Sequence, residues 1–316
     1  MKAIVAAPQG AQAVELPTPQ PGPHDILVRV KAASLNRADL AGLAAKDGKV
    51  IGMEWAGEVV QAGAEAGPWQ VGDRVMCTGA GAFAEYAVTD GGRACRIPDD
   101  ALPWEEAAVL PLALQAMHDA LVTHGRLAPG DDVLIHGASS GVGLMGLQIA
   151  RLLGARKVFG TSTRADRLAQ LTDFGADEAI DASQPGWHER VLAATDGKGV
   201  EVIVDQVTGK DFGSTFKTAA IGARVVNLGR LGGADGQFDF QLHALRRISY
   251  TGVTFRTRSA QEIRDLNARM LADLGDAIGA RRLRLPIDSR FALEQAGDAL
   301  AHMAANRHFG KIVLTL

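Results

Sequence analysis

The chain has few of the residues that several classes of protein require. Its only cysteines are Cys77 and Cys95, too few for a disulfide scaffold or a four-thiolate zinc site. Their scarcity favours a reduced, cytoplasmic location. No apolar run reaches the ~18 residues of a membrane span, and the apolar run at the N-terminus is shorter than the ~7–15 residues typical of a signal peptide. We therefore expect neither a secreted disulfide-rich domain nor a membrane protein.

Neither sign of charge dominates. Lys and Arg together number 33 and Asp and Glu 36, for a net charge of -3 at pH 7. This balance provides no general attraction for nucleic acid or for an anionic membrane. The 316 residues are 47% hydrophobic and include 37 Gly, so the chain can bury a sizeable core and form many tight turns. At ~150 residues per domain, the length predicts about two domains.

Residues 1 to about 100 have the pattern of a β-rich domain. Short apolar runs at 25–30, 57–60 and 74–76 lie between clusters of Gly, Pro and Asp, as in strands joined by tight turns. The pattern changes near residue 103, where a helix is predicted over 103–123.

Beyond that helix, predicted strands alternate with helices or long connections. The strands are expected at 132–136, 156–161, 178–181, 200–205, 223–228 and 248–255, followed by an amphipathic helix at 260–275 and a final strand within 309–316. This alternation is typical of βαβ units with a parallel sheet. The sequence therefore predicts a doubly wound α/β domain over 113–254, inserted into a β-rich domain made of 1–112 and 255–316. A cleft between the two is the expected ligand site.

Residues 136–144, His-Gly-Ala-Ser-Ser-Gly-Val-Gly-Leu, follow an apolar strand and open a predicted helix. This is the context of the dinucleotide-binding loop of a Rossmann domain, in which small residues bring helix N–H groups against a pyrophosphate. The strict Gly-x-Gly-x-x-Gly pattern is not met, and a structural tight turn is the alternative. The residues expected to bind the cofactor here are Ser139, Ser140, Gly141, Val142 and Gly143.

The next strand indicates which dinucleotide would bind. An NAD site usually has Asp or Glu about 20 residues after the glycine loop, to bond the ribose 2′-hydroxyl. This chain has Ser162 and Thr163 there, with Arg164 and Arg167 close behind and Asp166 about a turn too late. Hydroxyl and guanidinium donors suit a 2′-phosphate, so NADPH is expected rather than NADH. In the alternative, both arginines lie on the solvated first turns of a helix.

Several motifs together resemble one family. Alongside the loop at 136–144 they are Ala-Ser-Leu-Asn-Arg-Ala-Asp-Leu at 33–40, Gly-Met-Glu-Trp-Ala-Gly-Glu-Val at 52–59, Val-Gly-Asp-Arg-Val at 71–75 and Gly-Lys-Ile-Val-Leu at 310–314. The chain resembles the zinc-independent quinone oxidoreductases of the medium-chain dehydrogenase/reductase superfamily. The resemblance implies a Rossmann domain inserted in a GroES-like domain. It also implies a homodimer whose sheet continues across the interface through the strand around Ser249–Phe255.

The resemblance also indicates whether the chain has the ligands of a catalytic zinc. Zinc-dependent relatives have a cysteine near position 36 and Gly-His-Glu at 52–54, whereas this chain has Asn36 and Met53 and no cysteine after residue 95. No metal is therefore expected. Without that Lewis acid, the expected substrate is an electrophilic acceptor, a quinone or an α,β-unsaturated carbonyl, that takes hydride once it is positioned.

Two residues are candidates for catalysis. By resemblance, Asn36 faces the substrate, and its amide can donate to a developing oxyanion without ionising. The alternative is an asparagine in a turn. His118 stands where many family members have a threonine near the cofactor, and it could donate to nicotinamide or substrate or act as a general acid. Its alternative is a histidine on a helix surface.

Further cofactor contacts are carried over by position. Asn227, Leu228 and Gly229 end a strand where the nicotinamide should lie, and Phe255 and Lys311 are weaker candidates. Lys311 could equally be a solvated charge. The stretch 40–50 lacks the tyrosines of many family members, so a stacking wall for a quinone is expected to be missing.

The leading interpretation is an NADPH-dependent quinone reductase. The alternatives are an enone or enal double-bond reductase on the same fold, a non-catalytic NADPH-binding protein, and a detached enoyl-reductase module. No linker or neighbouring-domain remnant in the sequence supports the last of these.

Overall fold

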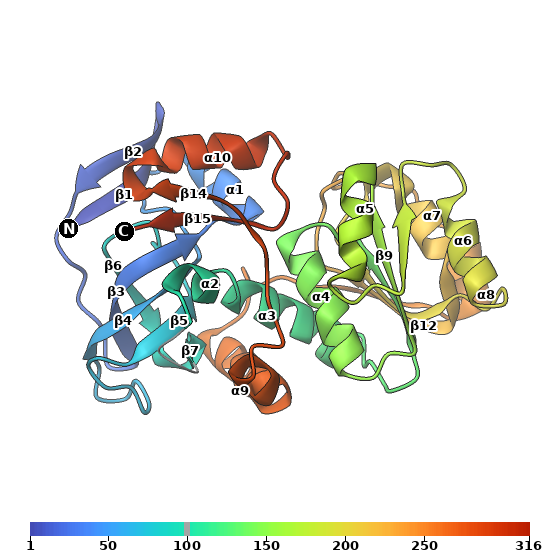
Figure 1. Cartoon of the computed structure of the whole chain (residues 1–316), viewed down its shortest axis with the longest axis horizontal. Coiled ribbons are helices and arrows are strands. Elements are labelled where there is room, and N and C mark those ends of the chain that lie inside the picture. The colour runs from blue at the N-terminus through green and yellow to red at the C-terminus, as the bar shows by residue number, and fades with distance from the viewer. Residues whose placement is uncertain (98–101) are drawn as a thin grey trace. The chain divides into compact units, whose positions relative to one another are not determined.

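The computed structural model describes residues 1–97 and 102–316, which divide into two compact units (Figure 1). Unit 1 consists of Met1–Leu112 and Ser259–Leu316, and unit 2 of Ala113–Arg258. The sequence placed the second boundary between residues 254 and 255, four residues earlier. In the structure the Arg258 guanidinium bonds Asp119 of unit 2 at 2.6 Å, and this contact joins the end of the segment to unit 2.

Unit 1 is built on strands, as its sequence pattern indicated. A two-stranded antiparallel ribbon and a seven-stranded sheet of order β14-β15-β3-β4-β5-β7, with β6 also on β3, make up its β structure. The strands are β1 (Lys2–Ala7), β2 (Gly10–Glu15), β3 (Asp25–Ser34), β4 (Glu54–Ala62), β5 (Arg74–Thr78), β6 (Tyr86–Asp90), β7 (Ala94–Arg96), β14 (Ile287–Ala292) and β15 (Lys311–Thr315). Strands from both ends of the chain therefore share one sheet and one core.

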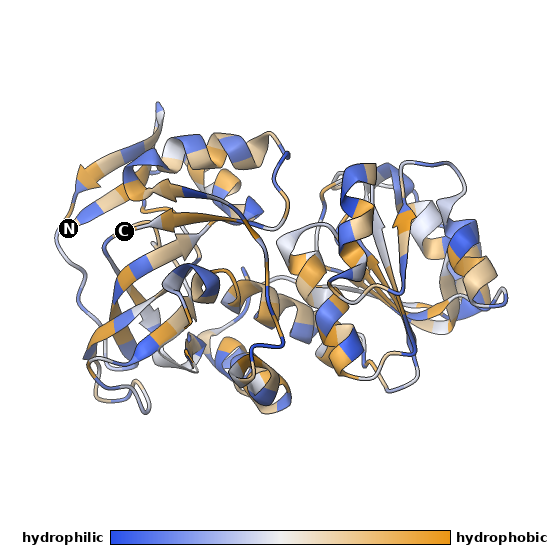
Figure 2. Ribbon diagram, viewed as in Figure 1, coloured by the Kyte–Doolittle hydropathy of each residue, from blue (hydrophilic) through white to orange (hydrophobic). Residues whose placement is uncertain are grey.

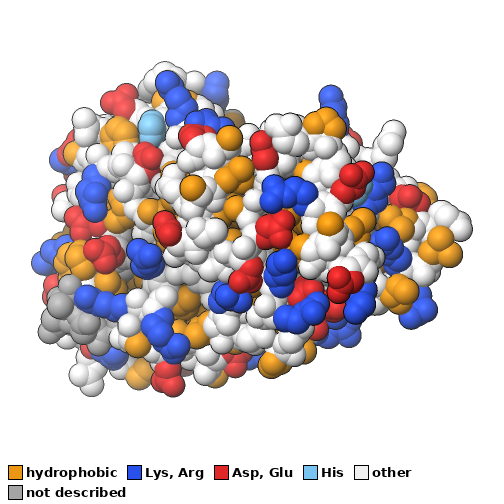
Figure 3. All heavy atoms as spheres, turned by 45° about the vertical axis from the view of Figure 1, so that its right-hand side comes forward, with side chains coloured by type: hydrophobic (Ala, Val, Ile, Leu, Met, Phe, Trp, Pro, Cys, Tyr) orange, Lys and Arg blue, Asp and Glu red, His pale blue; other side chains and the backbone are white. Residues whose placement is uncertain are grey.

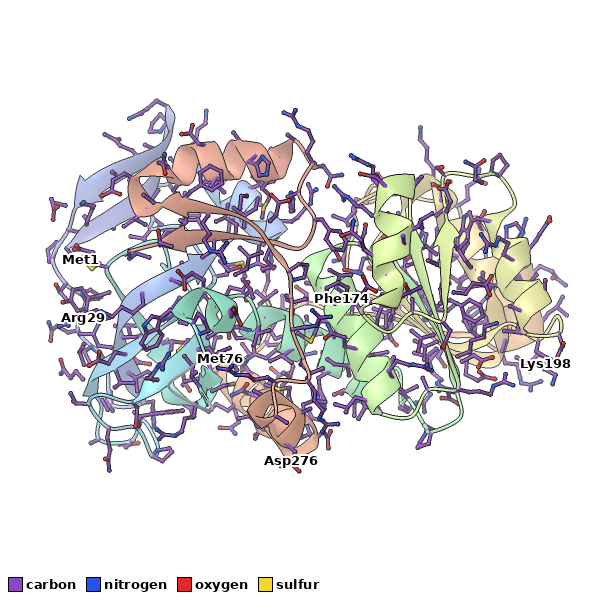
Figure 4. All side chains as sticks on the ribbon, in the orientation of Figure 1. Met1, Arg29, Met76, Phe174, Lys198 and Asp276 are labelled. Carbon is purple, nitrogen blue, oxygen red and sulfur yellow. The ribbon has the colours of Figure 1, made fainter. Side chains whose placement is uncertain are left out.

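The core of unit 1 lies on these strands and is closed by helices. Trp55 on β4 is fully buried, and so is Met76 on β5, which is labelled in Figure 4. The helical segments of this unit, with α3 running across the boundary, are α1 (Arg37–Ala45), η1 (Gly91–Arg93), α2 (Trp104–Ala108), α3 (Pro111–His118), α9 (Ala260–Gly279), η4 (Leu293–Gln295) and α10 (Ala296–Ala304). Helix α9 begins with a capping box in which Ser259 and Glu262 satisfy each other's backbone N–H groups.

Unit 2 contains one wholly parallel sheet of order β10-β9-β8-β11-β12-β13. Its strands are β8 (Asp132–His136), β9 (Lys157–Ser162), β10 (Glu178–Asp181), β11 (Val200–Asp205), β12 (Ala219–Asn227) and β13 (Ser249–Gly252). The first strand lies inside the sheet, so the chain winds outward in two directions from it. The predicted fold class, a doubly wound α/β domain joined to a β-rich domain, is confirmed.

Helices connect the parallel strands of unit 2, as the right-handed βαβ crossover requires. They are α4 (Gly141–Leu152), α5 (Ala165–Thr172), α6 (Trp187–Ala194), η3 (Gly209–Asp211), α7 (Phe212–Lys217) and α8 (Phe240–Arg246), while η2 (Asp119–His124) precedes the first strand. The strands of this sheet are largely apolar along their length (Figure 2). Most of their side chains are buried, because helices pack on the sheet.

Some predicted elements have other bounds in the structure. The helix expected over 103–123 is divided into α2, α3 and the π-helical turn η2. The strand expected to reach Phe255 ends at Gly252.

On the face shown in Figure 3, acidic and basic side chains are interspersed, as the balanced composition suggested. Among the described residues, no helix is both long and apolar enough to cross a bilayer.

Candidate functional site

A buried network of charged and polar side chains surrounds Asn36 in unit 1. Asn36 precedes α1, its side chain 8% exposed, and its Nδ2 donates to Glu54 Oε1 at 2.9 Å. The Lys311 ammonium at the start of β15 donates to Asn36 Oδ1 at 2.9 Å and also to Glu54 Oε1. Glu54 Oε2 accepts the N–H of Leu112 at 3.0 Å. The alternative that placed Lys311 as a solvated charge is therefore wrong.

One of the two N–H groups of the Asn36 side-chain amide makes only a long hydrogen bond. Its second contact is to the Ser34 carbonyl at 3.4 Å, near the limit of a hydrogen bond. A better-placed acceptor can replace that contact. The ammonium on Oδ1 draws electron density from the amide and so strengthens Nδ2 as a donor.

Asp39 is a second buried carboxyl beside Asn36. Its Oδ2 accepts the Asn36 backbone N–H at 2.7 Å. Burial raises the pKa of Asp39 to about 7, against the opposing effects of that hydrogen bond and of the Lys311 charge. This group therefore changes charge near neutral pH inside the core of unit 1.

The substitution Asp39→Asn is expected to flatten the pH dependence of stability. Because the folded-state pKa lies above the unfolded value of 3.8, folded wild type holds the proton more tightly. Its free energy of unfolding then falls as pH rises toward 7, by about 2 kcal/mol between pH 5 and 7. Asparagine stays neutral and can accept the same N–H, so that fall should be absent.

Urea unfolding at pH 5, 6, 7 and 8, followed by tryptophan fluorescence, measures this difference. Three of the four tryptophans, Trp55, Trp69 and Trp104, lie in unit 1. Asp47→Asn is the matched control, because the pKa of that exposed carboxyl is lowered by Lys49 and it is ionised throughout this range. Parallel pH profiles for wild type and Asp39→Asn would contradict the assignment.

The residues at the positions of a catalytic zinc do not fit that metal. The Asn36 amide is engaged with Glu54 and Lys311, and Met53 offers only a thioether. Cys77 and Cys95 are both fully buried within strands, and burial raises the pKa of each thiol, which disfavours the thiolate that zinc needs. Within residues 1–97 and 102–316, no three His, Cys, Asp or Glu side chains are grouped as metal ligands.

The loop between β8 and α4 in unit 2 has the geometry of an anion site. Ser140 caps α4, its Oγ accepting the Gly143 N–H at 3.0 Å. A Cβ on Gly143 would lie 2.7 Å from Ala138 Cα, so only glycine permits this close approach of helix and loop. The N–H groups of Gly141 and Val142 have no partner among the described residues. They are the free donors that a pyrophosphate at a helix N-terminus uses.

The hydroxyl groups expected at a 2′-phosphate lie beside this loop. Ser162, at the end of β9, donates to Ser139 Oγ at 3.0 Å and accepts the Arg164 N–H at 3.1 Å. The exposed Arg164 guanidinium makes a two-point ion pair with Asp166, at 2.9 and 2.8 Å, and Thr163 is exposed beside it. Arg167 differs, because it is only 6% exposed, and the solvated alternative is wrong for it.

The loops after β11 and β12 are hydrogen-bonded to each other and to the loop after β8. Asn227 Nδ2 donates to the Gly229 carbonyl at 3.0 Å and to Thr208 Oγ1 at 3.2 Å. Gln206 Nε2 donates to the Gly137 carbonyl at 3.2 Å, and its Oε1 accepts from Ser140 Oγ at 2.9 Å. The structure thus brings the candidates at 139–143, 162–164 and 227–229 to one edge of the unit 2 sheet.

The remaining candidates lie elsewhere. His118 ends α3 and is 1% exposed, so the alternative of a surface histidine is wrong. Phe255 is half-buried in unit 2, with the Arg258 guanidinium 5.5 Å from its ring centre. Asn36 and Lys311 belong to unit 1 and are joined directly by a hydrogen bond.

Sequence reasoning missed several residues of these clusters. Gln206 was not singled out from the sequence, and Glu54 was included only as part of the motif at 52–59. The Glu54–Lys311 pair joins residues 257 positions apart, and no local pattern signals it. His136 and Thr161 could have been singled out, because both are polar at the buried ends of apolar strands.

Comparison with known families gives two matches, which together include parts of both units. Residues 22–99 match the alcohol dehydrogenase GroES-like domain, and residues 141–272 match the family described as zinc-binding dehydrogenase. The second description names a metal for the family as a whole, which the side chains of this chain do not fit.

Individual relatives agree with these matches. A mycocerosic acid synthase-like polyketide synthase from Mycolicibacterium smegmatis is 30% identical over 333 residues, covering 100% of this chain but only 15% of the synthase. A quinone oxidoreductase from Pseudomonas syringae has a similar structure (TM-score 0.86, 28% identity, 100% of this chain and 99% of that one). So has a mycobacterial protein complexed with NADPH (TM-score 0.88, 26% identity, 100% of both chains).

The first family match lies within unit 1, the second lies mostly in unit 2 and ends in α9 of unit 1, and the similarity to the solved structures extends over the whole length of the chain. On these grounds, this chain belongs to the medium-chain dehydrogenase/reductase superfamily of oxidoreductases.

Proposed function

We propose that the chain is an NADPH-dependent, zinc-independent reductase that delivers hydride to a quinone. The observation that carries the proposal is the loop between β8 and α4, with its free N–H groups and the close approach at Gly143. The similarity to a quinone oxidoreductase and to a protein complexed with NADPH supports the acceptor and the cofactor.

The side chains of unit 2 suit the cofactor. Gly141 and Val142 would bind the pyrophosphate through their N–H groups, while Ser162, Thr163 and Arg164 would bind the 2′-phosphate. Asn227, Leu228 and Gly229 would border the nicotinamide, with Phe255 and Lys311 as weaker contacts. Bound NADPH supplies the hydride.

The side chains of the chain itself would orient and polarise the acceptor. Asn36 Nδ2 would release the long contact to Ser34 and donate to the acceptor oxygen, strengthened by the Lys311 charge on its Oδ1. Donors already oriented toward a developing oxyanion stabilise it without reorganisation. We assign His118 the second donor role, toward the nicotinamide or the substrate.

A second candidate is reduction of the carbon–carbon double bond of an enone or enal. The identity to segments of polyketide synthases favours it, because conjugated double bonds are reduced as saturated polyketide chains are built. This reaction would use the same cofactor geometry and the same oxyanion donor, so the acceptor decides between the two.

Anaerobic NADPH oxidation by chelator-treated protein tests both, with one quinone and one linear enone. Faster turnover of the quinone supports the proposal, and turnover of the enone alone assigns the double-bond reductase. NADPH binding without turnover of either would instead support a binding protein. The Asn36 role requires that Asn36→Ala lower kcat on whichever acceptor is used, by about 10²–10³-fold for a lost oxyanion donor.

We also propose that two copies associate through β13. This strand is an edge of the sheet, and the neighbouring helix α8 has no buried residue. Its Phe240 and Leu245 are 76% and 66% exposed, an apolar surface that a second copy would cover. Phe240→Asp should then halve the mass measured by light scattering, whereas Val71→Asp, at an equally exposed apolar site on unit 1, should not.

A further inference from the structure

Four polar side chains form a row across the unit 2 sheet, where β9, β8, β11 and β12 end. They are Thr161, His136, Asp205 and Asn227, and Asp205 is paired in register with both His136 and Asn227. The residues two positions earlier in each strand are Phe159, Leu134, Ile203 and Val225, which belong to one buried apolar cluster. Because side chains alternate along a strand, the polar row lies on that same face, and each member is at most 5% exposed.

The hydrogen bonds of His136 define its tautomer. Thr161 Oγ1 accepts the Gly137 N–H at 3.0 Å and lies 2.7 Å from His136 Nδ1. Among the described residues, His136 Nδ1 is the acceptor that lies within reach of the Thr161 hydroxyl proton, so the hydroxyl donates to Nδ1. The ring proton is then on Nε2. Burial lowers the pKa of His136, against the opposing charges of Asp205 and Asp211, so the ring is neutral.

Asp205 holds the loop that follows β11. Its Oδ1 accepts the N–H groups of Val207 and Thr208, at 2.8 and 3.0 Å. Thr208 has φ 53° and ψ -145°, a conformation that costs a β-branched residue free energy and persists only where its surroundings enforce it. Its hydroxyl donates to the Gly229 carbonyl at 2.7 Å. The Asp205 carboxylate therefore acts, through Thr208, on the segment proposed to border the nicotinamide.

One hydrogen-bond donor and one acceptor of this row are left to account for. His136 Nε2 and Asp205 Oδ2 are buried and have no hydrogen-bond partner among the described residues. They belong to residues paired in register on adjacent strands, and adjacent strands are ~4.8 Å apart. A buried N–H and a buried carboxylate oxygen left without partners would each be costly. One water bonded to both satisfies them, as buried waters do for such pairs.

We propose that a single buried water joins His136 Nε2 to Asp205 Oδ2, and that His136 is thereby a positioning residue for the dinucleotide. The completed chain runs from Gly137 N–H through Thr161, His136, the water, Asp205 and Thr208 to Gly229. It fixes the spacing between the loop after β8 and the loop after β12. The proposal rests on the proposed function, since those loops matter to binding only where a dinucleotide spans them.

His136→Phe tests the chain because phenylalanine keeps a ring to stack on Trp187, now 5.0 Å from the imidazole, but offers neither nitrogen. Binding of NADPH, which needs both loops, should weaken about tenfold, as expected for one lost coupling between them. Binding of adenosine 2′,5′-bisphosphate, which reaches only the loops after β8 and β9, should change less than about twofold. Equal losses for both ligands would indicate general loosening and would overturn the positioning role.

His188→Phe is the matched control. This histidine also contacts Trp187, at 6.4 Å between ring centres, but lies outside the row, so its replacement should alter neither affinity.

A measurement on the wild-type protein keeps the proposal testable if His136→Phe does not fold. Long-range ¹H–¹⁵N spectra should show the His136 proton on Nε2 at pH 7.5 and 8.5, with exchange cross-peaks from that proton to a long-lived water. A proton on Nδ1, or the absence of such a water, would refute the chain. If wild type bound neither NADPH nor the bisphosphate, the proposed function would fail, while these spectra would still decide whether the bridge exists.

Discussion

Replacing Lys311 with methionine is expected to lower the free energy of unfolding by about 3–5 kcal/mol, the cost of leaving a buried charge without its partner. Glu54 is fully buried and Lys311 only 4% exposed. Methionine has a similar volume but no charge, so Glu54 would be left with only the Asn36 and Leu112 N–H groups to stabilise it. Of the ion pairs described in unit 1, the Lys311–Glu54 pair has its two charged side chains most completely buried.

The companion substitution Glu54→Gln should restore most of that loss. Glutamine still accepts a hydrogen bond from Leu112 or Asn36 but carries no charge to desolvate. The double variant Glu54→Gln, Lys311→Met is therefore expected within about 1–2 kcal/mol of wild type, since removing both members of a buried ion pair costs far less than removing one. Unfolding of wild type, both single variants and the double variant by urea gives the coupling energy directly.

The control is Lys2→Met in the same unit. Lys2 also pairs with a glutamate, Glu294, but both side chains are exposed, at 41% and 51%, and water screens such pairs. Its replacement should leave the urea midpoint unchanged. A Lys311→Met protein as stable as wild type would show that the Lys311–Glu54 pair is not desolvated as the structure places it.

The fold could be predicted from the sequence where the pattern is local. Strands 132–136, 178–181 and 200–205 have the predicted bounds, because each is a short segment bounded by turn residues, and 132–136 and 200–205 are also largely apolar. Strand β12 begins four residues before the predicted 223, since the register shift near Val200 extends its pairing beyond the apolar run. The helix predicted over 103–123 is interrupted before Pro111, the first residue of α3, because proline has no N–H to continue a preceding helix but is tolerated in the first turn of a new one.

The candidate site was less predictable because its chemistry depends on distant partners. The motifs found Asn36 and the loop at 139–143. They could not show that Lys311 reaches Asn36 and Glu54 across the whole chain, nor that Arg164 already pairs with Asp166. Burial and pairing of a charged side chain are properties of the folded chain, and they cannot be predicted from the sequence of one segment.

The second large expected effect is on cofactor choice, and it concerns Arg164, which pairs with Asp166 in the structure. Arg164→Ala should weaken NADPH by about 10–100-fold, the range for one lost charged hydrogen-bonding group. NADH, which lacks the 2′-phosphate, should change less than about twofold. Fluorescence titration with each cofactor measures the ratio of the two dissociation constants. Arg190→Ala is the control, because Arg190 is also exposed and also pairs with an acidic residue, Glu178, but lies on α6 and outside the proposed site. Equal losses for the two cofactors would refute the assigned role.

Asp166→Ala tests the same site from the opposite direction. In the structure the Arg164 guanidinium donates two hydrogen bonds to the Asp166 carboxylate. The negative charge of Asp166 therefore lies near the expected 2′-phosphate. A phosphate must therefore compete with this carboxylate for the guanidinium and also tolerate its repulsion. Removing the carboxylate should tighten NADPH several-fold and leave NADH unchanged, and the gain should shrink as salt screens both charges. If Asp166 instead bonded the ribose hydroxyls of NADH, the same substitution would weaken NADH, and the preference for NADPH could not be assigned to Arg164.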